Sequence, residues 1–187
     1  MRYEKSFTMK DGRTCILRNG TEQDGQKLLD VFIQTHAETD YLLSYPDETE
    51  MTAETEAAFL KESTEGANRI EMIAEVDGVA VGAAGFAPVG KKEKVRHRAE
   101  FGISVFRDYW GLGIGRAMTE ACIECAEAAG ITQLELEVVA ENKAAIALYE
   151  SEGFIEYGRN PKGFRSRLTG WQELVLMRLD LEDRRRS

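Results

Sequence analysis

The chain has 187 residues, of which 43% are hydrophobic and 30% are charged, with 17 Gly and only 3 Pro. This composition is typical of a globular domain, and a chain of this length buries roughly 70% of its unfolded surface without disulfides or a structural metal. Asp and Glu number 33 against 24 Lys and Arg, so the net charge is −9. Such an acidic balance disfavours nucleic acids and anionic membranes as partners, because both attract positive charge.

Cysteine usage and hydropathy bear on the compartment. The 3 cysteines, Cys15, Cys122 and Cys125, are too few and odd in number for a secreted disulfide framework. The N-terminus lacks the apolar core of a signal peptide, and no stretch approaches the roughly 18 apolar residues of a membrane span. We therefore expect one domain over residues 1–187, in the cytoplasm. Cys122 and Cys125 fall on the apolar face of a predicted helix, which favours core packing, and we expect no metal site.

The first half of the chain is expected to contain two helices and an antiparallel pair of strands. Thr21 and Asp24 have the spacing of a capping box, which predicts the start of a helix. Asp77-Gly78 separates two apolar runs, and this dipeptide tolerates the positive φ that a two-residue hairpin requires. The expected elements are a short, partly apolar run at Thr14–Arg18, a helix after Thr21, a helix over Thr52–Ser63, and strands over Ile70–Val76 and Val79–Phe86.

The second half is expected to alternate strands and helices. Gln133–Val138 alternates apolar and polar residues strictly, so one face of this strand is predicted to be buried. The other expected elements are strands over Ala99–Phe106 and Trp171–Leu181, helices over Gly115–Ala129 and Lys143–Glu152, and a charged tail at Arg184–Arg186. Helices early, antiparallel strands in the middle and helices between later strands predict a mixed α/β sheet.

Three alternate glycines, Gly111, Gly113 and Gly115, lie between the strand that ends near Val105 and the next helix. Such a turn directs several backbone N–H groups, reinforced by the helix dipole, toward one point. Glycine also allows a pyrophosphate to approach the backbone closely. A sterically tight strand-to-helix turn would explain the same glycines without a ligand.

Two other phosphate-binding motifs fit this sequence poorly. A dinucleotide fingerprint beginning at the first or second of these glycines would require Gly or Ala at Arg116 or Met118. A P-loop beginning at Gly85 would place Lys92 where Ser or Thr should hold magnesium. Both alternatives are therefore disfavoured, and hydride chemistry loses support with the first.

Two motifs resemble those of the GCN5-related N-acetyltransferase (GNAT) superfamily. Its acetyl-CoA signature is Gln or Arg, two residues, Gly, one residue, then Gly or Ala, and Gly113 and Gly115 match the two small positions. Trp110 stands where the family has Arg or Gln. The second motif is the run Asn142–Glu150 followed by Gly153-Phe154. The resemblance covers about residues 14–181 and implies a mostly antiparallel central sheet flanked by helices.

The resemblance implies acetyl-CoA as the co-substrate. Its contacts are expected from the backbone N–H of Val105 to the thioester carbonyl, from Asn142 to the pantetheine arm, and from the glycine loop, namely Gly111, Gly113, Ile114, Gly115 and Arg116. Tyr149 resembles the acid that protonates the leaving thiolate. Glu100 is the candidate base, acting through water, and Gly102 on the same strand face would leave room for that water. A helix N-cap would also explain Asn142.

The predicted reaction is transfer of acetyl from acetyl-CoA to a primary amine by direct attack in a ternary complex. The segment from Glu38 to Glu56 is rich in acidic residues, including Glu48 and Glu50, and by resemblance borders the acceptor site. Its charge favours a cationic amine, either a small molecule or the terminus of a peptide or protein. A non-catalytic acyl-CoA sensor or scaffold is the alternative. A homodimer is expected only from the habit of the family.

Overall fold

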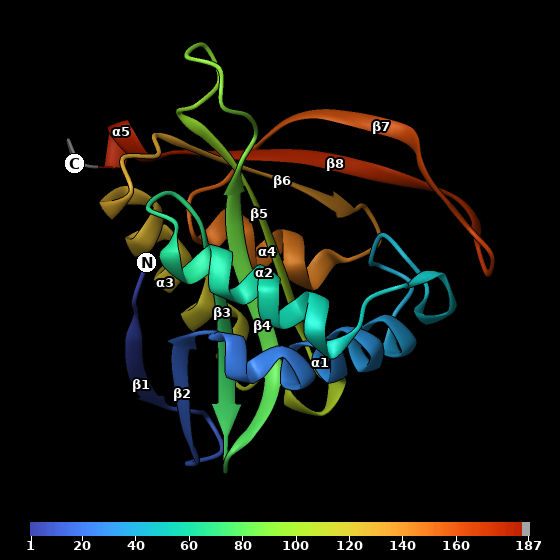
Figure 1. Ribbon diagram of the computed structural model, residues 1–187. Coiled ribbons are helices and arrows are strands. Elements are labelled where there is room, and N and C mark those ends of the chain that lie inside the picture. The colour runs from blue at the N-terminus through green and yellow to red at the C-terminus, as the bar shows by residue number, and fades with distance from the viewer. Residues whose placement is uncertain (185–187) are drawn as a thin grey trace.

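The computed structural model describes residues 1–184, which contain one eight-stranded sheet with the strand order β1-β2-β3-β4-β5-β6-β8-β7 (Figure 1). The strands are β1 (Glu4–Thr8), β2 (Thr14–Asn19), β3 (Ile70–Val76), β4 (Val79–Pro88), β5 (Arg98–Val105), β6 (Gln133–Val139), β7 (Ile155–Ser166) and β8 (Gly170–Asp180). The helices are α1 (Gly25–Glu38), α2 (Ala53–Glu65), α3 (Ile114–Ala128), α4 (Lys143–Ser151) and α5 (Leu181–Arg184).

All neighbouring strands run antiparallel except β5 and β6, which are parallel. Pairing between β5 and β6 extends only from Arg98 opposite Gln133 to Glu100 opposite Glu135. Strand β5 continues to Val105, where it is paired with β4 alone. The two parallel strands therefore separate beyond Glu100 and open a gap in the sheet.

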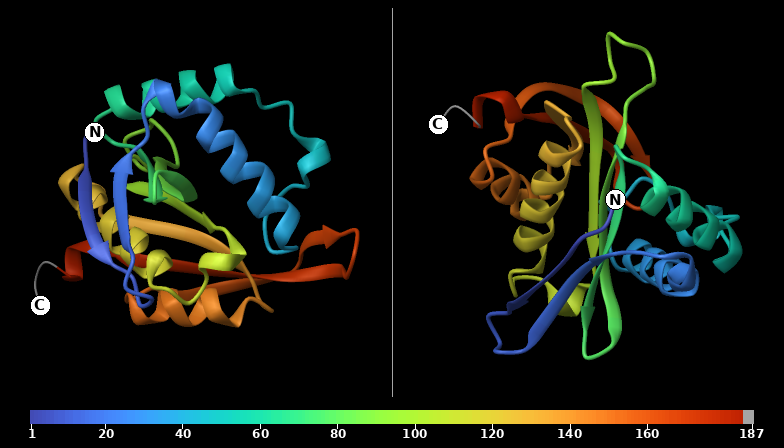
Figure 2. Two further views of the ribbon diagram at one scale, coloured as in Figure 1. Left: turned by 90° about the horizontal axis from the view of Figure 1, so that it is seen from below. Right: turned by 60° about the vertical axis from the view of Figure 1, so that its left-hand side comes forward.

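Helices cover both faces of the sheet (Figure 2). Helices α1 and α2 lie on one face, and α3 and α4 lie on the other. The core consists of buried aliphatic and aromatic side chains between these layers, among them Leu17, Leu60, Met72, Ile73, Met118 and Leu134. Within residues 1–184, no helix is long and apolar enough to cross a membrane. The mixed α/β sheet, mostly antiparallel and flanked by helices, is confirmed.

The local predictions at the two turn motifs are confirmed. Asp77 and Gly78 have φ values of 51° and 81° between β3 and β4, as the hairpin requires. The backbone N–H of Thr21 donates a hydrogen bond of 3.0 Å to the Asp24 carboxylate, and α1 begins at the next residue. Cys122 and Cys125 are buried in α3 as free thiols, and burial raises the pKa of both.

Strands β1 and β7 were not predicted, and residues 14–18, noted in the sequence only as a short, partly apolar run, form most of strand β2. Strand β1 is exposed along most of its length, so its sequence carries no alternating apolar pattern. Strand β7 has irregularities between Glu156 and Gly158 and between Asn160 and Phe164, which interrupt the two-residue period. Of the predicted charged tail, Arg184 donates a hydrogen bond to the Glu152 carbonyl, whereas residues 185–187 lie outside the described part of the chain.

Candidate active site

The glycine loop has the backbone geometry of an anion-binding turn. Gly111 and Gly113 have φ values of 75° and 101°, which residues with a Cβ rarely adopt. Gly113 is the N-cap of α3, so the first N–H groups of this helix point out of the loop without partners within the helix. Gly115 has a different role, since a Cβ there would lie 3.3 Å from Leu148 of α4. The loop can therefore receive a phosphate group, and α4 closes one side of it.

The side chains beside the loop are engaged with the protein. Arg116 donates hydrogen bonds of 2.7 Å to Glu152 and 2.9 Å to Ser151, which ties α3 to the end of α4. The indole N–H of Trp110 donates a hydrogen bond of 2.7 Å to the Val105 carbonyl. The tryptophan at the usual Arg or Gln position thus connects the loop to the end of β5. Phosphate binding here would depend on the backbone rather than on these two side chains.

The end of β5 directs its backbone toward the gap between β5 and β6. The N–H of Phe106 donates a hydrogen bond of 2.9 Å to the Val81 carbonyl on the β4 side. Successive residues of a strand point their N–H groups to opposite sides, so the N–H of Val105 faces away from β4. The gap therefore has a backbone donor at its open end, where the sequence analysis placed the contact to a thioester carbonyl.

Tyr149 of α4 packs at the point where β5 leaves β6. Its side chain is 7% exposed, with its ring centroid 6.2 Å from that of Phe101 and 5.8 Å from that of Phe154. Within residues 1–184 the phenol makes no hydrogen bond. Burial raises the pKa of Tyr149, so the phenol keeps its proton at neutral pH. This group can donate a proton to an atom that enters the gap.

Glu100 and Gly102 occupy the opposite face of β5, toward α1 and α2. Glu100 is exposed, and both residues border the cavity described below. A Cβ built on Gly102 would meet no atom within 4 Å, so the space above it is open. A water molecule can therefore lie between Glu100 and the gap. Asn142 accepts a hydrogen bond of 3.2 Å from the Ala145 N–H, which places it at the N-cap of α4 and leaves its amide NH₂ for a ligand.

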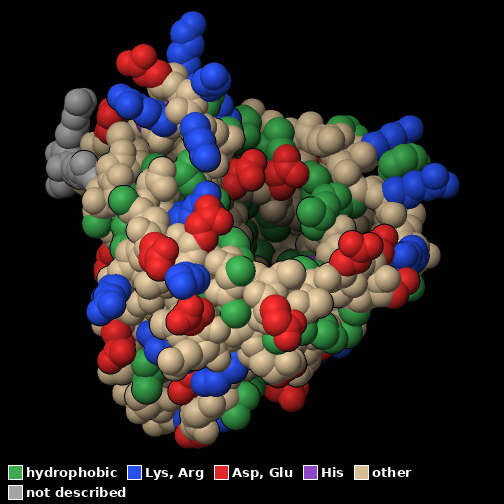
Figure 3. Space-filling view, in the orientation of Figure 1, with side chains coloured by type: hydrophobic (Ala, Val, Ile, Leu, Met, Phe, Trp, Pro, Cys, Tyr) green, Lys and Arg blue, Asp and Glu red, His purple; other side chains and the backbone are tan. Residues whose placement is uncertain are grey.

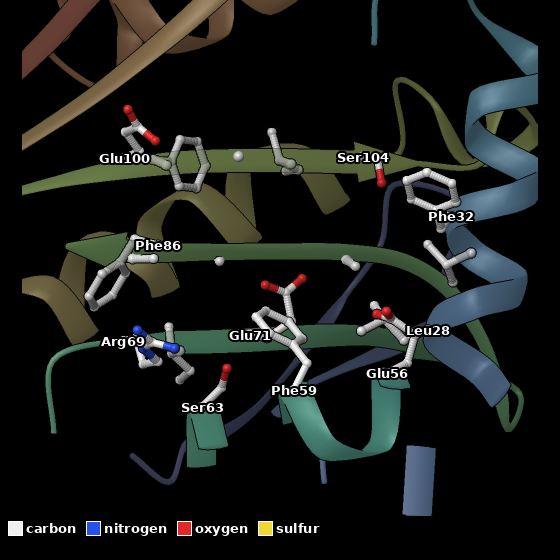
Figure 4. A pocket seen from close by; sticks show the side chains of 18 of the residues that line it. Leu28, Phe32, Glu56, Phe59, Ser63, Arg69, Glu71, Phe86, Glu100 and Ser104 are labelled. Atoms are coloured by element: carbon white, nitrogen blue, oxygen red, sulfur yellow. The ribbon is translucent and has the colours of Figure 1, made fainter. Parts of the chain in front are cut away.

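A cavity of 520 Å³ lies between the sheet and helices α1 and α2. Its floor is formed by strands β3, β4 and β5, with small residues at Ala83, Gly85, Ala87 and Gly102. Figure 3 shows the hollow on the surface with Asp and Glu side chains around its rim, and Figure 4 shows the side chains that project into it. An acceptor molecule can reach the gap from this cavity, because Glu100 and Ser104 of β5, which border the gap, also line the cavity.

The acidic segment between α1 and α2 borders this cavity, but several of its carboxylates face the β7–β8 hairpin instead. Asp40 accepts hydrogen bonds of 2.6 Å from Ser166, 3.1 Å from Thr169 and 3.1 Å from Gln172. Arg167 at the hairpin tip forms ion pairs with Asp47 and Glu48, at 2.7 and 3.3 Å, and lies over the ring of Tyr45. These carboxylates hold two distant segments together (Figure 1).

The carboxylate that sequence reasoning missed is Glu71. It projects from β3 into the cavity, beside Glu56 of α2, and is the acidic residue nearest the centre of the view in Figure 4. Burial and the nearby charge of Glu56 raise the pKa of Glu71 to about 8. The sequence contains one signal for Glu71. This carboxylate stands between the apolar residues Ile70 and Met72 in a predicted strand, and an acidic residue inside a buried run needs an explanation.

Comparison with curated proteins gives matches to an N-acyltransferase and an N-acetyltransferase. The chain is 27% identical over 113 residues to the L-amino acid N-acyltransferase MnaT of Escherichia coli (strain K12), covering 60% of this chain and 65% of that protein. It is 54% identical over 56 residues to the ribosomal protein bS18-alanine N-acetyltransferase of the same strain, covering 30% and 38%. The chain therefore spans less than two thirds of the length of these curated relatives.

Whole-chain similarity is seen with solved structures. The acetyltransferase of the GNAT family from Streptococcus pneumoniae superposes with a TM-score of 0.85 at 27% identity, covering 89% of this chain and 99% of that one. A model of the acetyltransferase (GNAT) family matches residues 32–154, from within α1 to the end of the second motif. The chain belongs to the GNAT acetyltransferase family.

Proposed function

We propose that the protein is an N-acetyltransferase that moves acetyl from acetyl-CoA to a primary amine. The observation that supports this most directly is the sheet gap, which has the glycine loop and Tyr149 on one side and an open cavity on the other. A donor bound along the loop and an acceptor in the cavity would meet at Val105. A protein that only bound acyl-CoA would have no need of a cavity on the second face.

In the proposed reaction the amine nitrogen attacks the thioester carbonyl within a ternary complex. The N–H of Val105 stabilises the oxyanion that forms as the nitrogen–carbon bond forms. Glu100 accepts the ammonium proton through a water above Gly102. When the carbon–sulfur bond breaks, the thiolate takes the phenolic proton of Tyr149. The backbone of the loop at Gly113 receives the pyrophosphate, and the amide of Asn142 contacts the pantetheine arm.

The names of the relatives point to two kinds of acceptor. MnaT is an L-amino acid N-acyltransferase, and the bS18-alanine enzyme acts on a ribosomal protein. Both acceptors are primary amines, so the proposed chemistry is the same for either. The acceptor cavity of this chain is open to solvent at its rim (Figure 3), which would admit a small molecule or a chain terminus.

The experiment that tests this function follows isotope-labelled acetyl-CoA by mass spectrometry in a mixture of metabolites and peptides. We expect the label on a defined amine, and we expect Tyr149→Phe to slow the transfer roughly 100-fold, within the range for loss of a general acid. Tyr3→Phe is the matched control, because the Tyr3 phenol bonds to Glu124 on the outer surface of α3. Binding of acetyl-CoA with no labelled amine would favour a sensor instead, and full turnover by Tyr149→Phe would show that the acid is misassigned.

A further inference from the structure

Two carboxylates enter the cavity from different elements at the end away from Glu100. Glu56 comes from α2 and Glu71 from β3 (Figure 4). The carboxylate of Glu71 lies over Gly85 of β4, since a Cβ at that glycine would come within 2.3 Å of Glu71 Oε2. The neighbouring strand thus gives this side chain the room to lie along the cavity floor.

Neither carboxylate has a partner among residues 1–184. Glu56 is only 6% exposed, yet it forms no hydrogen bond or ion pair within the described chain, and the same is true of the carboxylate of Glu71. Burial raises the pKa of Glu56, and burial together with Glu56 raises that of Glu71 to about 8. Glu56 is buried and Glu71 is half-buried, and two carboxylates this close without a cation are unfavourable when both are charged, so this pair fits a site that receives positive charge from outside.

The other titratable side chains of the cavity do not neutralise the pair. Arg69 lines the cavity, but its guanidinium donates a hydrogen bond of 2.9 Å to Glu62 at the surface of α2. His36 has its pKa lowered by burial, and its Nδ1 lies 2.8 Å from the Phe32 carbonyl, so the ring is neutral at physiological pH. Glu100 adds further negative charge at the other end.

The walls between the two ends are mostly apolar. Side chains of α1, α2 and the segment between them line the cavity, including Leu28, Val31, Phe32, Met51 and Phe59. Hydrocarbon is favoured against such walls, whereas a second polar group midway would lose its hydration. The lining therefore suits an alkyl chain that ends in a cation.

The sheet register sets the length of that chain. Glu71 pairs with Gly85, and Gly85 pairs with Gly102, so Glu71 lies two strands from β5. Val105 lies three residues beyond Gly102. With ~4.8 Å between strands and ~3.4 Å per residue, the Cα atoms of Glu71 and Val105 are ~14 Å apart. The Glu71 side chain spans part of this distance, which leaves room for an alkyl chain of several methylenes.

We propose that the acceptor is an aliphatic primary amine that carries a second cationic group, and that Glu56 and Glu71 bind this second cation while the first amine reacts at Val105. This inference rests on the proposed acetyl transfer. The proposed substrate is therefore defined by two groups, the primary amine that is acetylated and a cation at the other end of the chain.

The test compares cadaverine with pentylamine, which share a five-carbon chain and differ by the second ammonium. We expect kcat/KM for cadaverine to exceed that for pentylamine at least tenfold, the range of a hydrogen-bonded charge. The double variant Glu56→Gln/Glu71→Gln should remove this preference by raising KM for cadaverine much more than KM for pentylamine, which has no second cation to bind. Glu65→Gln, on the exposed side of α2, is the matched control and should retain the preference.

Calorimetry of cadaverine binding in the presence of CoA gives a readout that does not require turnover. At pH 7 binding should release a proton to the buffer, because Glu71 must ionise to pair with the ammonium, and the double variant should show no release. Equal use of both amines, with no effect of the double variant, would overturn the inference while acetyl transfer stood. Absence of acetylation of any amine would refute the proposed function, and the calorimetric result would still decide the cation site.

Discussion

Asp40 connects the wall of the acceptor cavity to the β7–β8 hairpin, and its replacement tests whether this connection controls acceptor binding. The Oδ2 atom accepts three hydrogen bonds, from Ser166, Thr169 and Gln172, and Oδ1 accepts one of 3.1 Å from Tyr45. All donors are neutral, so the full negative charge of one carboxylate strengthens every bond. Asp40→Asn keeps the shape of the side chain but removes that charge.

The size of the expected effect of Asp40→Asn follows from the number of hydrogen bonds that Asp40 Oδ2 accepts. A hydrogen bond to a charged group contributes ~1.5–3 kcal/mol and a neutral one ~0.5–1.5 kcal/mol, so each bond weakens by about 1 kcal/mol. Three bonds give about 3 kcal/mol, which corresponds to a population of the detached segment on the order of 100-fold larger. Because this segment lines the cavity through Leu42 and Met51, KM for the acceptor should rise while KM for acetyl-CoA stays constant.

Hydrogen exchange measured by mass spectrometry reports the detachment directly. Amides in residues 39–52 and 166–170 should exchange faster in Asp40→Asn, with little change in the central strands. Asp47→Asn is the matched control in the same segment, because Asp47 and Arg167 are 68% and 52% exposed and such a pair contributes at most ~1 kcal/mol. If both variants gave the same exchange and the same KM, the reasoning that Asp40 holds the wall would be refuted.

Three further predictions concern the loop and the N-terminal helix. Gly113→Ala forces a Cβ into φ of 101°, at a cost of about 1–2 kcal/mol, and steady-state kinetics should show KM for acetyl-CoA raised ~10-fold with KM for the acceptor unchanged. Trp110→Phe removes the bond to the Val105 carbonyl, worth ~1 kcal/mol, and should lower kcat severalfold while lowering the melting temperature by only about 2–4 °C. The Arg18 guanidinium, through hydrogen bonds of 2.8 Å, holds the pKa of Asp24 well below its usual range. Ionised Asp24 therefore stabilises the folded state above an unfolded pKa of ~3.9, and this stabilisation is lost as the pH falls below that value. Urea titrations should show the free energy of unfolding falling in acid, and this fall should be smaller in Asp24→Asn.

Sequence reasoning succeeded where one local interaction decides the backbone. The hairpin at Asp77-Gly78 and the glycine loop before α3 both depend on positive φ, which the residue types reveal directly. It could not reveal contacts between segments that lie far apart in the chain. The acidic residues at Asp40, Asp47 and Glu48 looked like a surface that attracts cations, but their partners lie more than 100 positions away on the β7–β8 hairpin. No pattern in one sequence reveals such partners.

Glu71 shows the opposite case, in which a pattern was present but its meaning needed three dimensions. Strand β3 has a buried face on each side, and Glu71 interrupts the face toward α1 and α2. Only the pairing with Gly85 and the approach of Glu56 from α2 turn that interruption into a pair of carboxylates. The room for the Glu71 side chain comes from Gly85 of β4, and the second carboxylate comes from Glu56 of α2. These residues lie more than ten positions from Glu71 in the sequence.

The division of the sheet into two faces explains why the acceptor class is encoded away from the glycine loop. The loop, α3 and α4 form one face, and the cavity under α1 and α2 forms the other, so the two faces communicate where β5 leaves β6 after Glu100. In the proposed reaction Val105 and Tyr149, at this opening, take part in acetyl transfer, whereas Glu56 and Glu71, on the far wall of the cavity, determine which amine is bound. Substitutions at Glu56 or Glu71 could therefore change the acceptor without disturbing Val105 or Tyr149, because Glu71 lies two strands from β5 and Glu56 belongs to α2.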